Sequence, residues 1–427
     1  MKRKTILHLA AILLICGASC TKQNRNNQFT TKESRVMYYD STNTQPGVIL
    51  LDMVSQSKCD LIDRDGNSLK KYPFGLICFL NDGSMLGKKD SFLVKLDSSL
   101  NILWKTRFDF ELHHEITVDD NGNIYVFGSH THSFMGYNIR FDIVNILSKG
   151  GKLIYEWCVF DHLEEFIAII SKSAWLKHLP LTFEKCESIE QYIRQDPLRF
   201  IVPTDADCDC RYEFTHFNAL QVIPENKLTV KIPAFKKGSL LISFHPYSCY
   251  GILDTSTDKI EWVGYLPERT RLHFPNLTAD GTILVFQNCT PLGWTPRGGY
   301  DSLQAAFLEQ TPHEILKQQP EPRLWTSVTE YDPLTNQKVW EYTTDPKESM
   351  CATSRGSAQR LPNGNTLVAA TTKEQGGRAF ELTPDKKIVW EYSYPEIDEQ
   401  DSVPIGFYRV KWISNDFAQK IISVHSK

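Results

Sequence analysis

The sequence predicts an all-β protein: a six-bladed β-propeller of four-stranded antiparallel blades, with loop and helical insertions on one face. Two kinds of hairpin support this prediction. In the first, apolar residues flank a turn containing Asp, Gly or Lys, and the second strand ends on an aromatic residue. In the second, a turn leads directly into an apolar strand. Because the two kinds alternate along the chain, they supply the four strands that each blade of a propeller requires.

The first kind of hairpin recurs six times, and five of its copies end on tryptophan. We expect these tryptophans to fill the wedge between neighbouring blades, since a large ring at one position of every repeat suits a repeated packing role. The copies begin at residues 61, 95, 146, 252, 330 and 381, and the tryptophans are Trp104, Trp157, Trp262, Trp340 and Trp390.

The second kind begins at residues 81, 120, 238, 280 and 363, and "GFYRVKWI" at 406 predicts a strand that completes the last sheet. Segments 160–212 and 288–327 interrupt the repeat, and "SIEQYIRQ" in the first of them predicts a short helix. We expect both insertions to shape a lid or pocket wall on one face. The propeller is expected over 59–427, preceded by residues 21–58 as a tether with extra strands.

Residues 1–20 resemble a bacterial lipoprotein signal peptide. A basic start is followed by an apolar run from Ile6 to Ile15, then by small residues and Cys20. The apolar run is too short to span a bilayer comfortably as a helix of the mature protein. We expect lipidation at Cys20 and anchoring to the outer membrane of a bacterial cell envelope. Plain secretion is the alternative, because Gly17 stands where such signals usually carry Leu.

Composition and cysteine usage narrow the class of protein. Charged residues make up 23% and apolar residues 41%, which is typical of a globular chain. The net charge of −4 and the lack of a basic stripe argue against nucleic acid as a partner. Loss of Cys16 and Cys20 with the signal leaves nine of the eleven cysteines, an odd number. We expect one or two disulfides, with Cys249 and Cys289 meeting as a thiol pair or bridge, and no metal site at Cys208 and Cys210.

Three histidines occupy similar places in the repeats. His114 lies eight residues before Gly122, His273 lies eight before Gly281, and His216 lies ten before Asn226. Because the inner strand of each blade lines the channel, we expect these histidines to converge, whereas His113 should point between blades. A neutral imidazole can attack a substrate and a protonated one can bind an anion. The alternative is that each histidine only forms hydrogen bonds between strands.

Several motifs resemble the bacterial arylsulfotransferase family from about residue 60 to 413. "GSAQRLPNGNTLV" and "GRAFELTPDKKIVWEY" resemble its last blade, and "HHEITVDDNGNIYVF" resembles its double-histidine strand. "FTHFNALQVIPEN" is similar to its His-x-Asn strand, and "RLHFPNLTADGTILVFQN" to its Gln-His-Asp segment. The resemblance implies transfer of a sulfuryl group from an aryl sulfate to a phenol through a sulfohistidine, with no nucleotide sulfate donor and no cofactor.

The resemblance also implies roles for individual residues. The nucleophile is expected at His273, supported by His114 and His216, with Asn218 binding the substrate. The family's arginine, however, is replaced by Phe244. We expect Arg271, Arg360 or His245 to supply the missing donor, because preorganised cations stabilise the charge that develops on the sulfuryl oxygens.

Three hypotheses for function follow. The first is an envelope arylsulfotransferase that uses His273. The second is a non-catalytic propeller lipoprotein that binds a ligand or partner protein at the channel face, which Phe244 and the two insertions favour. The third is a quinone-dependent dehydrogenase-like propeller, suggested by "YDPLTNQKVWEY" but disfavoured by six repeats instead of eight and by the lack of a metal-binding constellation.

Overall fold

The computed structural model describes residues 35–53, 58–89, 91–110, 112–203, 212–290, 323–372, 376–394, 397–398 and 403–422. The predicted signal peptide with Cys20, the Cys208–Cys210 segment and most of the second insertion lie outside these ranges. No helix within the described ranges is both long enough and apolar enough to cross a membrane.

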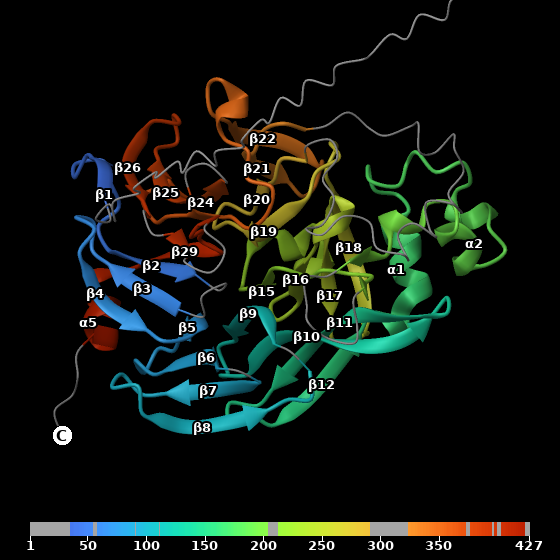
Figure 1. Ribbon diagram of the computed structural model, residues 1–427, viewed down its shortest axis with the longest axis horizontal. Coiled ribbons are helices and arrows are strands. Elements are labelled where there is room, and N and C mark those ends of the chain that lie inside the picture. The colour runs from blue at the N-terminus through green and yellow to red at the C-terminus, as the bar shows by residue number, and fades with distance from the viewer. Residues whose placement is uncertain are drawn as a thin grey trace, which may run out of the picture.

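Six blades of four antiparallel strands each form a ring, which confirms the predicted propeller (Figure 1), and two of the six sheets carry additional strands at the edge. From the inside outward, blade 1 contains β29 (Arg409–Ile413), β2 (Val48–Met53), β3 (Lys58–Ile62) and β4 (Ser68–Tyr72). Blade 2 contains β5 (Gly75–Phe79), β6 (Met85–Lys89), β7 (Phe92–Leu96) and β8 (Ile102–Arg107). Blade 3 contains β9 (His113–Val118), β10 (Ile124–Phe134), β11 (Tyr137–Leu147) and β12 (Leu153–Cys158).

The second half of the ring repeats this order. Blade 4 contains β15 (Leu220–Val222), β16 (Leu240–Phe244), β17 (Cys249–Asp254) and β18 (Lys259–Tyr265). Blade 5 contains β19 (Leu272–Leu277), β20 (Ile283–Gln287), β21 (Ser327–Asp332) and β22 (Gln337–Tyr342). Blade 6 contains β23 (Ser357–Arg360), β24 (Thr366–Thr372), β25 (Gly376–Leu382) and β26 (Ile388–Ser393), with β1 (Arg35–Tyr39) added at its outer edge.

The two ends of the chain close the ring within one sheet. Strand β29 pairs with β2, from Val48 opposite Ile413 to Asp52 opposite Arg409. The prediction that the strand near residue 406 completes the last sheet is therefore wrong, because this strand is the inner strand of blade 1. Since β2 also belongs to blade 1, the propeller begins before residue 59.

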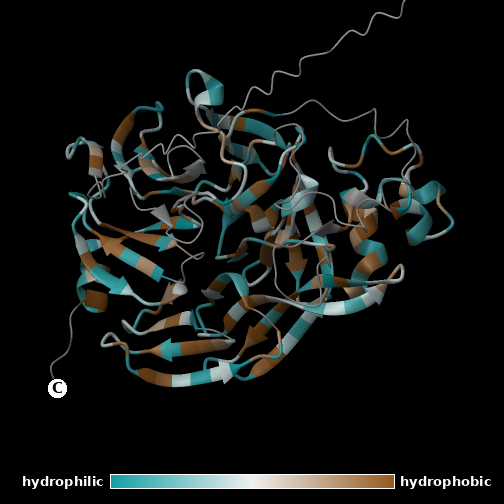
Figure 2. Cartoon of the chain, in the orientation of Figure 1, coloured by the Kyte–Doolittle hydropathy of each residue, from teal (hydrophilic) through white to brown (hydrophobic). Residues whose placement is uncertain are grey.

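The first insertion connects blades 3 and 4. It contains η2 (Phe160–His162), α1 (Leu163–Ile170), η3 (Phe183–Lys185), α2 (Ile189–Ile193), η4 (Pro197–Arg199), β13 (Val202–Pro203) and β14 (Tyr212–Glu213). Helix α2 confirms the helix predicted there, and Figure 2 shows α1 as largely apolar. Phe166 of α1 packs against Phe244 of blade 4, with ring centroids 5.2 Å apart.

The remaining elements are short. They are η5 (Lys227–Val230), η6 (Pro233–Phe235), η7 (His245–Tyr247), η8 (Lys347–Ser349), β27 (Ile397–Asp398), β28 (Val403–Pro404) and α5 (Asn415–Ile422).

The repeated tryptophans connect neighbouring blades. The indole Nε1 of Trp157 donates to the carbonyl of Asp258 at 3.1 Å, that of Trp340 to Pro384 at 3.1 Å, and that of Trp390 to Arg64 at 2.8 Å. In each case the acceptor lies in the outer hairpin turn of the next blade. The predicted position between blades is confirmed for these three rings, and each adds a directed hydrogen bond to the packing.

Candidate functional site

Four histidine rings lie next to one another at the centre of the propeller. His114 comes from β9, His216 from the segment before β15, His245 from η7 and His273 from β19. Successive ring centroids are 4.7 Å apart for His114 and His216, 5.3 Å for His216 and His245, and 4.5 Å for His245 and His273. The structure thus brings His114, His216 and His273 together and places His245, the fourth predicted histidine, between His216 and His273.

Bulges in the inner strands place two of these rings. His113 pairs with Phe127 and Ile116 with Val126, so His114 lies in a bulge of β9, with a left-handed φ of 59°. In β19, His273 pairs with Phe286 just before a smaller bulge. In the strand pairing, His273 therefore occupies the position equivalent to that of His113. The interpretation that His114 and His273 share one position is wrong. The larger bulge in β9 is the reason that His114 nevertheless reaches the cluster.

His273 has one fixed tautomer. Its Nδ1 lies 2.6 Å from Oδ1 of Asn288, while the amide nitrogen of Asn288 donates to the carbonyls of Ala352 at 3.1 Å and Arg355 at 2.9 Å. Because both donors of that amide are used, its oxygen must face the histidine. The hydrogen of His273 therefore lies on Nδ1, and Nε2 keeps its lone pair.

Burial keeps His273 neutral. It lowers the pKa of His273 to about 3, assisted by the positive charges of His216, Arg271 and Arg355 and opposed by the hydrogen bond to Asn288. At neutral pH the unprotonated Nε2 is therefore available as a nucleophile.

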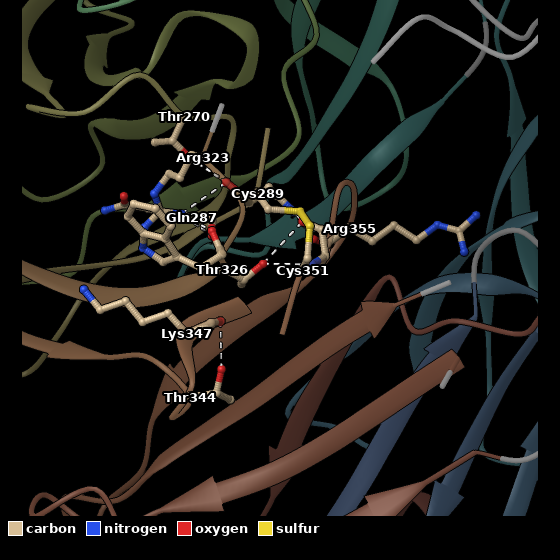
Figure 3. The surroundings of a disulfide bond; sticks show 12 residues. Thr270, Gln287, Cys289, Arg323, Thr326, Thr344, Lys347, Cys351 and Arg355 are labelled. Carbon is tan, nitrogen blue, oxygen red and sulfur yellow. Dashed lines mark hydrogen bonds between the residues drawn. A yellow bond between two sulfur atoms is a disulfide. The ribbon is translucent and has the colours of Figure 1, made fainter. Parts of the chain in front are cut away.

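A disulfide supports the loop that carries Asn288. Cys289 is bonded to Cys351, next to the carbonyl acceptor of Ala352 (Figure 3). Buried Arg323 adds a second support, because its Nη1 donates to the carbonyl of Asn288 at 3.3 Å. The predicted pairing of Cys289 with Cys249 is wrong: Cys249 is a buried free thiol, and the adjoining loops of blades 5 and 6 bring Cys351 to Cys289 instead.

A hydrogen bond joins the rings of His216 and His114. Their Nε2 atoms are 2.9 Å apart, and Nδ1 of His216 lies 2.9 Å from Oε1 of Glu213. Burial lowers the pKa of His216, but the Glu213 carboxylate and Asp142 outweigh it and the net shift is upward. Burial and the neighbouring His216 lower the pKa of His114 well below its usual range. The opposite pKa shifts favour His216 over His114 as the protonated ring, and a protonated His216 would donate from Nε2 to Nε2 of His114.

His245 stands beside the position where the family resemblance implies an arginine. Its Nδ1 donates to the carbonyl of Leu272 at 2.7 Å, so Nε2 keeps a lone pair. Burial and the nearby His273 and His216 lower its pKa well below the usual range. The preceding residue, Phe244, is 1% exposed and packs on Phe166 and Phe217, so this position is part of the apolar core.

The predicted cations lie in two different places. Arg271 precedes β19, and its charge acts on His216, His245 and His273; burial lowers its own pKa to about 10, opposed by Glu213. In contrast, Arg360 pairs with Glu330 and donates to Thr366 at 2.6 Å. These contacts join blades 5 and 6 at the turn end of β23, so the structure does not bring Arg360 to the histidines.

Asn218 and Tyr408 support the cluster. The side-chain nitrogen of Asn218 donates to the carbonyl of Leu272 at 3.0 Å, and its side-chain oxygen accepts from Ser243 at 2.6 Å. This side chain, predicted to bind substrate, is thus hydrogen-bonded to β19 and β16. Tyr408 stacks on His114 with centroids 5.3 Å apart and donates to the carbonyl of Asn218 at 2.6 Å. Sequence reasoning missed Tyr408, because its strand was assigned to the last sheet.

Within the described part of the chain, no three His, Cys, Asp or Glu side chains form a group that could hold a metal ion. The groups described at the site are four imidazoles, the Arg271 guanidinium, the Glu213 carboxylate and the Tyr408 side chain.

Comparison with known proteins identifies the family. The model of the family described as arylsulfotransferase (ASST) matches residues 61–395, and no curated protein matches the chain. A Bacteroides caccae protein of unknown function is 11% identical with a TM-score of 0.47, covering 86% of this chain and 99% of its own. The Neurospora crassa Pan2 WD40 domain is 10% identical with a TM-score of 0.41, covering 90% and 86%. On the family match, this chain belongs to the arylsulfotransferase family.

Proposed function

We propose that this protein transfers a sulfuryl group from an aryl sulfate to a phenol, with His273 as the nucleophile. The observation that carries the proposal is the hydrogen bond from His273 Nδ1 to Asn288, which leaves Nε2 of this buried histidine unprotonated beside three other imidazoles and Arg271. Family membership supplies the reaction class, and this fixed tautomer supplies a group able to begin the reaction.

The reaction divides into two balanced steps. In the first, the lone pair of His273 Nε2 attacks sulfur, an N–S bond forms, and the S–O bond to the aryl group breaks. The departing phenolate takes a proton from the pair formed by His216 and His114. In the second, the oxygen of an acceptor phenol attacks sulfur, the N–S bond breaks, and the phenol's proton returns to the same pair. Neither step consumes an oxidant, a reductant or a nucleotide.

Arg271 takes the electrostatic role that the family arginine would have. Its charge acts on three of the four clustered histidines, and negative charge develops on the sulfuryl oxygens as the bonds exchange. A preorganised donor of this kind typically contributes about 3 kcal/mol to transition-state stabilisation.

We also propose export and lipid anchoring at Cys20, on the signal-like pattern of residues 1–20. Metabolic labelling with a fatty acid tests it: the wild type should be labelled and Cys20→Ser should not. A labelled Cys20→Ser would contradict lipidation at this residue.

A non-catalytic ligand-binding propeller is the second candidate, because Phe244 is buried in the core where the family carries its arginine. One experiment separates the two functions. Purified mature protein is incubated with 4-nitrophenyl sulfate, with and without phenol, beside His273→Ala and the matched control His130→Ala, whose ring is partly exposed and pairs with Glu156.

If the protein transfers sulfuryl groups, phenol should stimulate nitrophenol release by the wild type and by His130→Ala, whereas His273→Ala should release none. Mass spectrometry of the wild type should then detect a sulfated peptide containing residue 273. Equal release from His273→Ala would overturn the assignment of the nucleophile. Absence of release by the wild type would favour the binding protein.

A further inference from the structure

A buried carboxylate, Asp142 of β11, contacts both chain neighbours of His216. Asp142 is 4% exposed. Its Oδ2 accepts from the backbone N–H of Phe217 at 3.0 Å, and its own backbone N–H donates to Oγ1 of Thr215 at 3.0 Å. Because Thr215 and Phe217 flank His216, Asp142 holds the chain on both sides of that ring.

The second carboxylate oxygen of Asp142 is bound by His113 of β9. Nε2 of His113 lies 3.0 Å from Oδ1 of Asp142 and 3.1 Å from the carbonyl oxygen of Gly128. Since both neighbouring atoms are acceptors, Nε2 carries a hydrogen and donates it. The ring stacks on Phe127 with centroids 5.9 Å apart and lies edge-on to His114 at 5.0 Å. The strand that carries His114 therefore also fixes the orientation of the Asp142 carboxylate.

Asp142 brings negative charge to this place although it is buried. Burial raises the pKa of Asp142, but hydrogen bonding and charge from His113 and His216 outweigh burial, so that the net shift is downward. Burial lowers the pKa of His216, and the carboxylates of Glu213 and Asp142 together outweigh it. The further titratable groups around His216, from the other elements packed on it, are His114 of β9, His245 of η7 and Arg271 before β19.

We propose that Asp142 is a positioning residue for the acid of sulfuryl transfer. It holds the chain around His216 and presents to that ring a second negative charge beside the one of Glu213. His113 keeps the carboxylate turned toward both tasks. This inference rests on the proposed function, in which the pair formed by His216 and His114 gives and takes the phenolic proton.

Asp142→Asn tests the charge, because it keeps the size of the side chain and removes the negative charge. The wild-type rate with 4-nitrophenyl sulfate should fall as pH rises through the raised pKa of His216, since the acid must be protonated. The variant should have a lower pKa at His216, so its kcat/KM should be about fivefold below wild type at about pH 8 and nearly equal to wild type at about pH 6. A loss by the same factor at every pH would show a merely structural role and overturn the inference.

The matched control is Asp254→Asn in the outer hairpin of blade 4. Like Asp142, the buried carboxylate of Asp254 accepts from a backbone N–H, that of Ser256 at 3.0 Å, and it pairs with a basic side chain, Lys236, at 2.5 Å. This variant should keep the wild-type pH profile. An equal shift in both variants would overturn the specific role of Asp142.

His113 provides a second test, which holds even where Asp142→Asn does not fold. His113→Gln can still donate an amide N–H toward Asp142, whereas His113→Leu cannot. The pH profile of His113→Gln should therefore lie closer to wild type than that of His113→Leu, whose rate should fall at lower pH. Identical profiles for the two variants would contradict the orienting role of His113.

A titration without substrate separates failure of this inference from failure of sulfuryl transfer. Nuclear magnetic resonance of the imidazole signals, with His216 assigned by its loss in His216→Gln, reports the pKa of that ring directly. The pKa of His216 should be lower in Asp142→Asn than in wild type and unchanged in Asp254→Asn, whether or not aryl sulfates are turned over. An unaltered pKa in Asp142→Asn would overturn the inference and leave the proposed function standing.

Discussion

The two ends of the histidine cluster differ in protonation although they are built from the same residue. At one end the neutral amide of Asn288 accepts from His273, and burial keeps the ring unprotonated. At the other end the carboxylate of Glu213 accepts from His216 and favours the protonated ring. The comparison teaches that the partner of Nδ1, an amide or a carboxylate, decides whether a buried imidazole acts as a nucleophile or as an acid.

Removing the side-chain amide of Asn288 should impair His273 as the nucleophile, and we expect this change to lower activity more than any other substitution described below. Asn288→Ala leaves Nδ1 of His273 without its acceptor, so both tautomers become populated and the ring turns more freely. We expect kcat for 4-nitrophenyl sulfate to fall about 10²-fold with a smaller change in KM, by analogy with the cost of losing one preorganised group. Steady-state kinetics check this, and circular dichroism confirms folding.

Asn288→Asp tests the same hydrogen bond in a second way. The new carboxylate can still accept from Nδ1 of His273, but its negative charge should raise the pKa of the ring. Its activity should recover at higher pH relative to Asn288→Ala. A pH profile identical for the two variants would contradict the role assigned to Asn288.

Glu213→Gln should weaken the acid end, with an expected loss of about tenfold in kcat/KM at neutral pH. The wild-type rate should fall as pH rises through the raised pKa of His216, because the acid must be protonated. Without the carboxylate this pKa falls, so the loss of rate should begin at lower pH. A pH profile of kcat/KM measures the shift, and an unchanged basic limb would show that His216 is not the acid.

Opening the disulfide should chiefly affect stability. Cys289→Ser combined with Cys351→Ser removes the bridge next to Asn288, and we expect unfolding in urea to require about 2–4 kcal/mol less free energy. The double variant should also lose part of its kcat for 4-nitrophenyl sulfate, by a smaller factor than Asn288→Ala does. Cys249→Ser, a buried free thiol, is the control that alters a cysteine without removing a bridge.

Phe244→Leu should produce the smallest effect on catalysis. The side chain is core packing against α1, so the substitution should cost about 1 kcal/mol of stability and leave kcat/KM within about twofold. Thermal unfolding and steady-state kinetics measure the two quantities. A large loss of activity without a loss of stability would show that Phe244 contacts the substrate.

Local patterns in the sequence were sufficient for the blades and for part of the site. Turn residues and alternating apolar positions identify hairpins whose strands are neighbours along the chain, and the repeated tryptophans report the contact between consecutive blades. His114, His216 and His273 could be selected because each precedes an inner-strand turn. These features depend on residues a few positions apart, and a local pattern contains that information.

Only the tertiary structure decided which distant segments meet. The pairing of β29 with β2 places Tyr408 against His114, and the joining of two loops places Cys351 beside Cys289 and fixes Asn288 against His273. The ion pair of Arg360 with Glu330 of the neighbouring blade is likewise a contact that only the tertiary structure shows. The physical reason is that folding the blades and closing the ring bring together residues from different strands and loops, and their contacts depend on packing that no local periodicity records.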